Sequence, residues 1–182
     1  MMKRTIHNPA LKETIHFTKT SIETQGAYSE LEISLAPGGG NPMHYHNSYT
    51  ELFTAVKGQL GLELKGGVVK LLEPGESYLV KMGEEHRFFN QTGEDIKFTN
   101  KVVPGSTGLE NTLRILSGLA NEGKYNEKNI PKNVYHLGIC AVMSDMRLTG
   151  ILGAITTPLV KTFAYLGKRK GIDKELIKTY CI

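Results

Sequence analysis

The chain has 182 residues, 22 Lys and Arg against 18 Asp and Glu, and a hydrophobic fraction of 40%. This length and composition favour one main domain with a packed core and room for an appended element. Two cysteines exclude a disulfide framework. The basic start of the chain has no apolar stretch behind it, so we expect no secretory signal and a cytoplasmic location.

The charge is uneven along the chain. Residues 1–103 carry 11 Lys and Arg against 12 Asp and Glu, whereas residues 104–182 carry 11 against 6. Much of the excess lies at Lys168–Lys170, where cations at the end of a helix are the simplest explanation. We therefore expect no nucleic-acid partner.

Alternating apolar residues and regular turns dominate the first hundred residues. Ile15 and Phe17 alternate with polar residues, and Tyr28–Leu35 does so throughout. Further strands are expected at 51–56, 59–65, 68–72, 78–80 and 86–90, and a last one that begins at 96–99, all divided by Gly and Pro turns. Short strands at this spacing are typical of a β-sandwich or a closed barrel.

The segment Gly38–Gly58 contains three side chains that can bind a metal, namely His44, His46 and Glu51. In an extended strand, His44 and His46 point the same way, about 7 Å apart. Glu51 can return on the next strand, and His86 begins another alternating stretch. Three imidazoles and a carboxylate suit a divalent first-row metal such as iron, manganese, nickel or zinc.

The spacing of these residues resembles the two motifs of the cupin family. Gly38, His44, His46, Glu51 and Gly58 match the first motif without a gap. The second motif is matched at Gly75, Gly83, His86 and Asn90, with Lys81 in place of its proline. The resemblance covers about residues 30–103. It implies a mainly β fold, a double-stranded β-helix or jelly-roll barrel, and a metal held by the three histidines and the glutamate.

A barrel lumen beside the metal would form a small-molecule pocket. By the period of two, Phe53 and Ala55 share the face of Glu51, and Phe88 and Asn90 share that of His86. These four residues are the expected pocket lining, although Phe53 and Phe88 could equally fill the core. Tyr45, Tyr49 and Arg87 are candidates for the rim.

After Val103 the pattern becomes helical. We expect residues 1–105 to form the barrel and residues 106–182 an α-helical extension. Helices are predicted from Gly108 to Gly123, from Asn129 through Met143, from Thr157–Pro158 to Gly167, and over Asp173–Tyr180. The apolar stretch from Leu148 to Leu166 is interrupted, so surface contact with a membrane is less expected than packing on the barrel or in a homodimer.

Two kinds of function fit this sequence. One is a metal-dependent enzyme acting on a small molecule, either a dioxygenase or an isomerase. The other is a non-catalytic binding or sensing module whose helical tail mediates oligomer or partner contacts. A purely structural metal is a third possibility, and the cupin resemblance does not choose among these because one fold hosts many functions.

Overall fold

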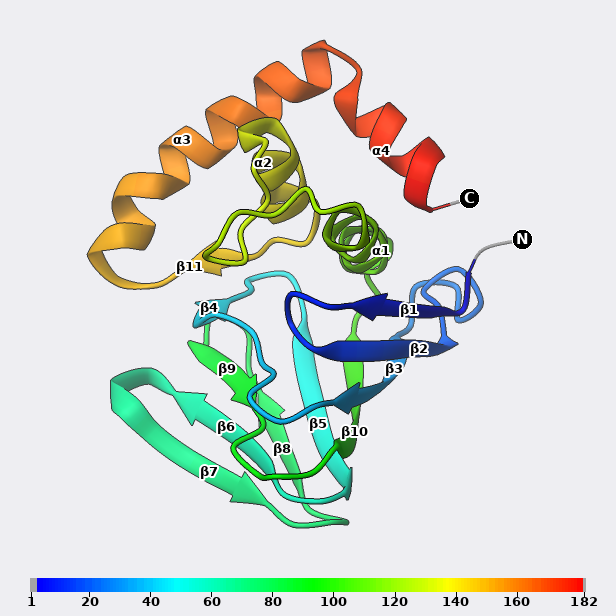
Figure 1. The fold of residues 1–182 in the computed structure, drawn as a ribbon, viewed down its shortest axis with the longest axis vertical. Helices are drawn as coiled ribbons and strands as arrows, with labels where there is room; N and C mark the ends of the chain where they lie inside the picture. The colour runs from blue at the N-terminus through cyan, green and yellow to red at the C-terminus, as the bar shows by residue number, and fades with distance from the viewer. Residues whose placement is uncertain (1–2, 182) are drawn as a thin grey trace.

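A computed structural model describes residues 3–181, except the side chains of residues 151, 152, 154 and 155. The chain forms two antiparallel sheets with a layer of helices over one end (Figure 1). The six-stranded sheet has the order β1 (Thr5–Asn8), β2 (Glu13–Lys19), β3 (Ser29–Leu35), β10 (Ile96–Val103), β5 (Thr50–Lys57), β8 (Ser77–Val80). The five-stranded sheet has the order β11 (Arg147–Leu148), β4 (His44–Tyr45), β9 (His86–Phe89), β6 (Leu60–Leu64), β7 (Val68–Leu72).

Alternation along the strands builds the barrel core. In β3, β5 and β10 every second residue is buried, as expected for strands with one face on the core. Phe53, Phe88 and Phe98 meet at the centre, with ring centroids 5.2–6.1 Å apart. The predicted jelly-roll barrel with a helical C-terminus is confirmed.

Turns at glycine connect these strands. Gly58 has φ +69°, which L side chains rarely adopt, and a Cβ there would lie 2.7 Å from Ile96. Gly83 has φ +77°, and its N–H donates to the carbonyl oxygen of His46 at 2.6 Å. The turn at Gly83 thus ties the start of β9 to the segment that carries His44 and His46.

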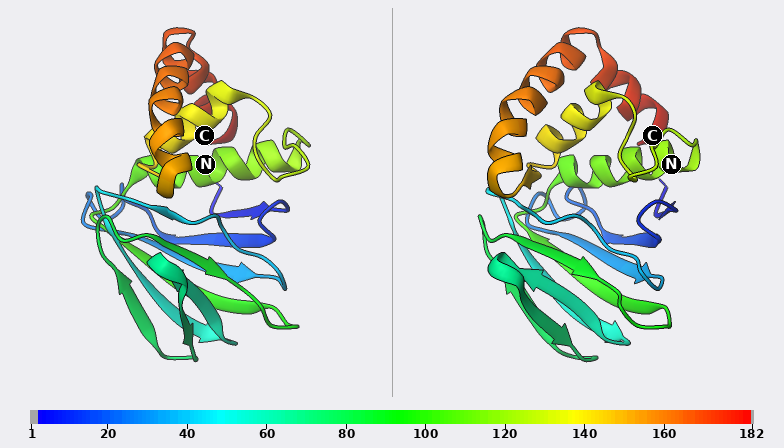
Figure 2. Two further views of the ribbon diagram at one scale, coloured as in Figure 1. Left: turned by 90° about the vertical axis from the view of Figure 1, so that its left-hand side faces the viewer. Right: turned by 60° about the vertical axis from the view of Figure 1, so that its left-hand side comes forward.

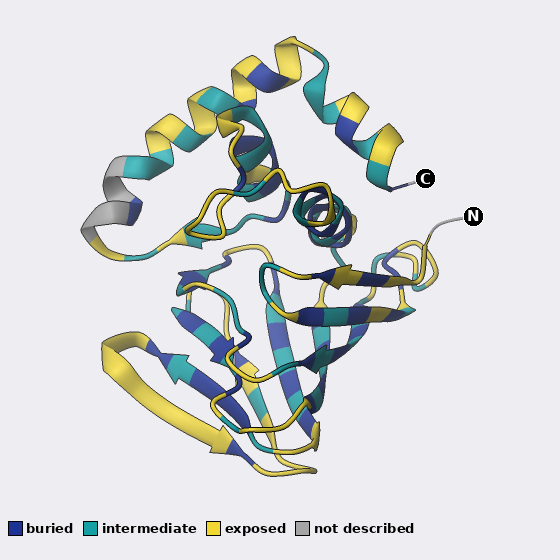
Figure 3. Cartoon of the chain, viewed as in Figure 1, coloured by how far each residue is buried: buried dark blue, intermediate teal, exposed yellow. Residues whose placement is uncertain are grey.

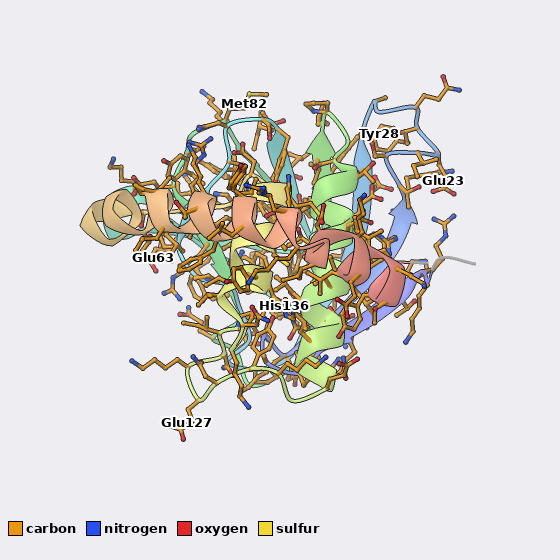
Figure 4. All side chains as sticks on the ribbon, turned by 90° about the horizontal axis from the view of Figure 1, so that it is seen from above. Glu23, Tyr28, Glu63, Met82, Glu127 and His136 are labelled. Carbon is orange, nitrogen blue, oxygen red and sulfur yellow. The ribbon has the colours of Figure 1, made fainter. Side chains whose placement is uncertain are left out.

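The helical layer contains α1 (Thr107–Asn121), α2 (Val134–Met143), α3 (Gly150–Arg169) and α4 (Ile172–Tyr180). It lies over one end of the barrel in all views (Figures 1 and 2). Seen from above, α3 and α4 cross over α1 (Figure 4). The layer has its own apolar core, in which Ile115, Leu119 and Ile139 are fully buried.

Two helix predictions need correction. The second helix begins at Val134 and not near Asn129, because Pro131 bridges to Tyr125 and the Asn133 side chain caps the helix by accepting from the N–H of Tyr135. Pro158 does not start a helix but lies inside α3.

α3 begins at Gly150, seven residues before the predicted start at Thr157. This first part includes residues 151, 152, 154 and 155, whose side chains lie outside the described residues. The Thr157 hydroxyl donates to the carbonyl oxygen of Gly153 at 2.6 Å, within the turn that precedes the proline. None of the helices in the described part of the chain combines the length and the apolar character that crossing a bilayer requires.

The boundary near residue 105 separates strands from helices, with one exception. β11 belongs to the helical half of the chain but pairs with β4 in the barrel sheet. β7 lies at the other edge of the same sheet and is exposed along most of its length (Figure 3).

Candidate metal centre

The four predicted ligands converge inside the barrel, at the end that faces the helices. Ligand atoms of His44, His46, Glu51 and His86 all lie within 4.8 Å of one another, and the four residues are at most 5% exposed. β4 and β9 pair with His44 opposite His86. The sheet register therefore explains how two separate motifs meet at one point.

Hydrogen bonds orient the His44 and His86 imidazoles. Nδ1 of His44 lies 2.8 Å from the carbonyl oxygen of Pro42, and Nδ1 of His86 lies 3.0 Å from that of Glu84. A carbonyl only accepts, so each Nδ1 carries a proton, which leaves Nε2 of a neutral ring as the atom that can bind a metal. This is the arrangement in which a histidine binds a metal through Nε2.

His46 reaches the same state through a tyrosine. Tyr49 donates its hydroxyl proton to the carbonyl oxygen of Ser144 at 2.8 Å, and its oxygen lies 2.7 Å from Nδ1 of His46. Because the hydroxyl proton is already donated to Ser144, Nδ1 of His46 donates to the Tyr49 oxygen. A second acceptor, the carbonyl oxygen of Asp145, lies 3.3 Å from the same nitrogen.

Glu51 supplies a carboxylate oxygen to the cluster. Its Oε2 lies 2.9 Å from Nε2 of His86 and 3.6 Å from Nε2 of His46. Its Oε1 accepts from Nδ2 of Asn100 at 2.7 Å. Asn100 therefore holds the carboxylate so that its other oxygen faces the histidines.

The protonation states suit a cation. Burial, followed by the charges of His86 and His46, lowers the pKa of His44 to about 3, and burial also lowers the pKa of His46. Burial opposes ionisation of Glu51, but the hydrogen bond with His86 and the histidine charges outweigh it and lower the pKa of Glu51 to about 2. Neutral imidazoles and an ionised carboxylate are the forms that bind metals.

His86 is the exception among the histidines. Burial lowers its pKa and is the largest single cause, but the hydrogen bond and charge of Glu51, together with the carbonyl and charge of Glu84, outweigh it, so the net shift is upward. A cation that binds here has to displace a proton from this pair, which makes its affinity dependent on pH.

The predicted pocket residues are all buried, and Phe53 lies beside His86. Phe53, Ala55 and Phe88 are at most 7% exposed and belong to the packed barrel core. The Asn90 amide is occupied by its own turn: Nδ2 donates to the carbonyl oxygens of Leu35 and Glu94, and Oδ1 accepts from Thr92. A surface hollow of about 470 Å³ lies elsewhere, at the edge between β7 and β8, lined by Lys70, Leu71, Leu72, Glu76, Ser77 and Tyr78.

Three residues near the site were missed or misplaced from the sequence. Tyr49, expected at the rim, is 2% exposed. Asn100 lies on β10, in the strand predicted to begin at Ile96, but it was not named as a site residue, although alternation from Phe98 turns it inward. Asp145 acts through its backbone oxygen, for which the sequence carries no signal.

Comparison with known proteins agrees with this geometry. The family model of the cupin domain matches residues 31–102, the segment that contains all four clustered residues. The chain is 35% identical over 88 residues to germin-like protein 3-8 of Oryza sativa subsp. japonica, which covers 44% of this chain and 39% of that protein. It thus spans about two fifths of that relative's length. Residues 31–102 therefore match a cupin domain.

Solved structures with similar barrels share little sequence with this chain. The polyketide cyclase RemF from Streptomyces resistomycificus is 23% identical, with a TM-score of 0.49 over 57% of this chain and 80% of that one. A predicted oxalate decarboxylase from Thermotoga maritima is 14% identical, with a TM-score of 0.49 over 57% of this chain and 98% of that one.

Proposed function

We propose that the protein binds one divalent first-row transition metal, iron, manganese, nickel or zinc, through His44, His46, Glu51 and His86. We further propose that it transforms a small oxygen-bearing molecule there, as a dioxygenase or an isomerase. The observation that carries the proposal is the convergence of one ring nitrogen from each of three histidines and one carboxylate oxygen within 4.8 Å. A cation bound among these atoms would take the place of the proton that His86 and Glu51 share.

The chemistry of the donor set supports a reactive site more than a closed structural one. Structural zinc sites commonly use thiolates, whereas three imidazoles and one carboxylate leave two positions of an octahedral metal open. A bound metal would supply Lewis acidity or, if it is iron, activation of oxygen.

The surrounding residues have simpler tasks. Glu51 balances one of the two positive charges of the metal, so that the centre still attracts an anionic or polar oxygen. Phe53 packs beside His86, with ring centroids 6.0 Å apart, and excludes water from that side. Burial, then the charges of Glu51 and Asp145, raises the pKa of Tyr49, so its hydroxyl stays protonated and acts as a fixed donor.

Metal content tests the proposal directly. Wild-type protein and the variants His44→Ala and His16→Ala would be loaded with zinc, manganese, nickel or ferrous iron, freed of excess metal and measured by mass spectrometry. His16 is the control because it lies exposed on β2, bonded to Thr5. We expect one metal per chain in wild type and His16→Ala and its loss in His44→Ala. Equal metal content in all three proteins, or none in any, would refute the proposed site.

A binding module without turnover is the second candidate. It is favoured by the contact between the helical extension and His46, which gives ligand occupancy a route to the helices. A turnover screen of the metal-loaded protein against small phenols, keto acids and sugars separates the two. Tight binding of a compound without its conversion would favour the module.

We also propose a cytoplasmic homodimer. Cys140 and Cys181 are both free and buried, a state compatible with a reducing compartment. Val68, Val69 and Leu71 expose apolar surface along the edge strand β7, which a second copy could cover. Light scattering after size exclusion would detect twice the 20.1 kDa chain mass for a dimer, and the chain mass alone would contradict it.

A further inference from the structure

The turn and short strand between α2 and α3 reach the metal centre. This bridging segment, residues Ser144–Leu148, belongs to the helical extension by its place in the chain. Its first two carbonyl oxygens lie next to Tyr49 and His46, at 2.8 and 3.3 Å. Its last two residues form β11 and pair with β4, which carries His44.

A side chain fixes the bridging segment at its other contact with the barrel. Oδ2 of Asp145 accepts from the backbone N–H of Asn47 at 2.8 Å, and Oδ1 accepts from Arg147 at 3.2 Å. Asp145 has φ +51°, a conformation that Asp and Asn tolerate better than most residues. The turn is therefore held in one conformation by its contact with the residue next to His46.

His46 differs from the other two histidines in how its ring is held. Nδ1 of His44 and Nδ1 of His86 each bond to a carbonyl two residues earlier in the chain. The corresponding partners of His46 are Tyr49 and the backbone of Asp145, 99 residues further on. Of the three imidazoles, His46 is the one whose orientation depends on the extension.

We propose that the bridging segment is part of the metal centre, so that docking of the helical extension and metal binding stabilise each other. This inference rests on the proposed metal site. Tyr49 is the positioning residue: it stacks on His46 with ring centroids 4.5 Å apart and connects it to the carbonyl oxygen of Ser144. Coupling between two binding equilibria is reciprocal. Bound metal must therefore raise the equilibrium constant for docking by the same factor by which docking raises the affinity for metal.

The first variant removes one hydroxyl group. Tyr49→Phe keeps the ring that stacks on His46 but loses the link to Ser144. The readouts are the Kd for zinc, measured by competition with a chromophoric chelator, and the visible spectrum of the cobalt-loaded protein, which reports ligand geometry. Loss of such an outer partner typically weakens metal binding 10- to 100-fold. We expect a Kd at least about 10-fold higher and a changed cobalt spectrum.

Matched variants separate this effect from general destabilisation. Tyr125→Phe removes a hydroxyl that also donates to a backbone carbonyl of the extension, that of Leu116, and should leave the zinc Kd unchanged. Asp145→Ala should raise the Kd, whereas Asp145→Asn should restore it, because the amide oxygen can still accept from Asn47 and Asn tolerates the positive φ.

Hydrogen exchange tests the reciprocal effect. Zinc should slow exchange of the amides of residues 144–148 in wild type, and less so in Tyr49→Phe. If wild type binds none of zinc, cobalt, manganese, nickel and ferrous iron, the proposed metal site is wrong and this inference is wrong with it. If wild type binds zinc and cobalt, but Tyr49→Phe and Asp145→Ala match it in Kd, spectrum and exchange, the coupling is refuted while the metal site stands.

Discussion

Glu13 is a carboxyl group on the core face of β2. It lies on the face of Ile15 and Phe17 and is 3% exposed. Burial raises the pKa of Glu13 from its ordinary 4.5 to about 7, because the ionised form loses its hydration there. Tyr125 is a titratable group close enough to feel this charge, and burial raises the pKa of Tyr125 as well, so it stays neutral.

This shift makes stability depend on pH in a defined direction. The folded chain keeps the Glu13 proton between about pH 4.5 and 7, where the unfolded chain has released it. The folded state therefore binds more protons in this window, and the free energy of unfolding falls as pH rises through it. The rise in pKa corresponds to about 3 kcal/mol of stability. This contribution is fully present below pH 4.5, falls as pH rises, and is absent above pH 7.

Glu13→Gln removes the ionisation and keeps the shape of the side chain. The measured quantity is the free energy of unfolding of the variant minus that of wild type. This difference should be more positive at about pH 8.5 than at about pH 4.5, by up to about 3 kcal/mol. Urea unfolding of wild type and variant at both pH values measures this difference. The other titrating groups are common to both proteins and cancel. Glu127→Gln, on an exposed loop at the edge of the helical layer (Figure 4), is the control and should show no such difference. An effect of Glu13→Gln that is the same at both pH values would refute the reasoning.

Three further substitutions test packing, the predicted pocket and the metal. Gly138→Ala would place a Cβ 2.8 Å from the carbonyl oxygen of Val160 and should destabilise the fold by about 1–3 kcal/mol in thermal unfolding. Gly93→Ala is the control, because the space around Gly93 is open. Equal losses of stability in both variants would contradict the role of the Val160 contact. Asn90→Ala should lower the free energy of unfolding by about 2–3 kcal/mol through lost turn hydrogen bonds, without changing zinc affinity; a specific loss of affinity would instead return Asn90 to the site. Zinc at about 100 times its Kd should stabilise wild type by about 2.7 kcal/mol, and Glu51→Gln should lose this protection; equal protection of both proteins would place the zinc elsewhere.

The barrel and its four clustered residues could be predicted because their signals are local. Alternation with a period of two assigns each strand an inner face, and it places His44 and His46 on the same side. The two glycine-bounded motifs then fix where each strand turns. The structure brings His86 opposite His44 through the pairing of β4 with β9.

The parts that the sequence left open or placed wrongly depend on contacts between distant segments. Phe53 and Phe88 fit either a pocket wall or a core equally well by periodicity, and only the arrangement of both sheets decides between them. Pro158 is a common first residue of a helix, yet here α3 continues through it. Proline inside a helix costs free energy, and packing of α3 against α2 offsets this cost. The sequence around Pro158 does not reveal that packing.

β4 shows most clearly why long-range contacts matter for the site. It has only two residues, His44 and Tyr45, and its pairing with β9 joins a single residue pair, His44 and His86. Without β11 it would lie at the edge of its sheet, held by that pair alone. β11 gives it a second neighbour, in which Leu148 lies opposite His44. A strand this short gains little from local propensity, so its pairing with β11 from the helical extension helps to hold His44 in the four-residue cluster.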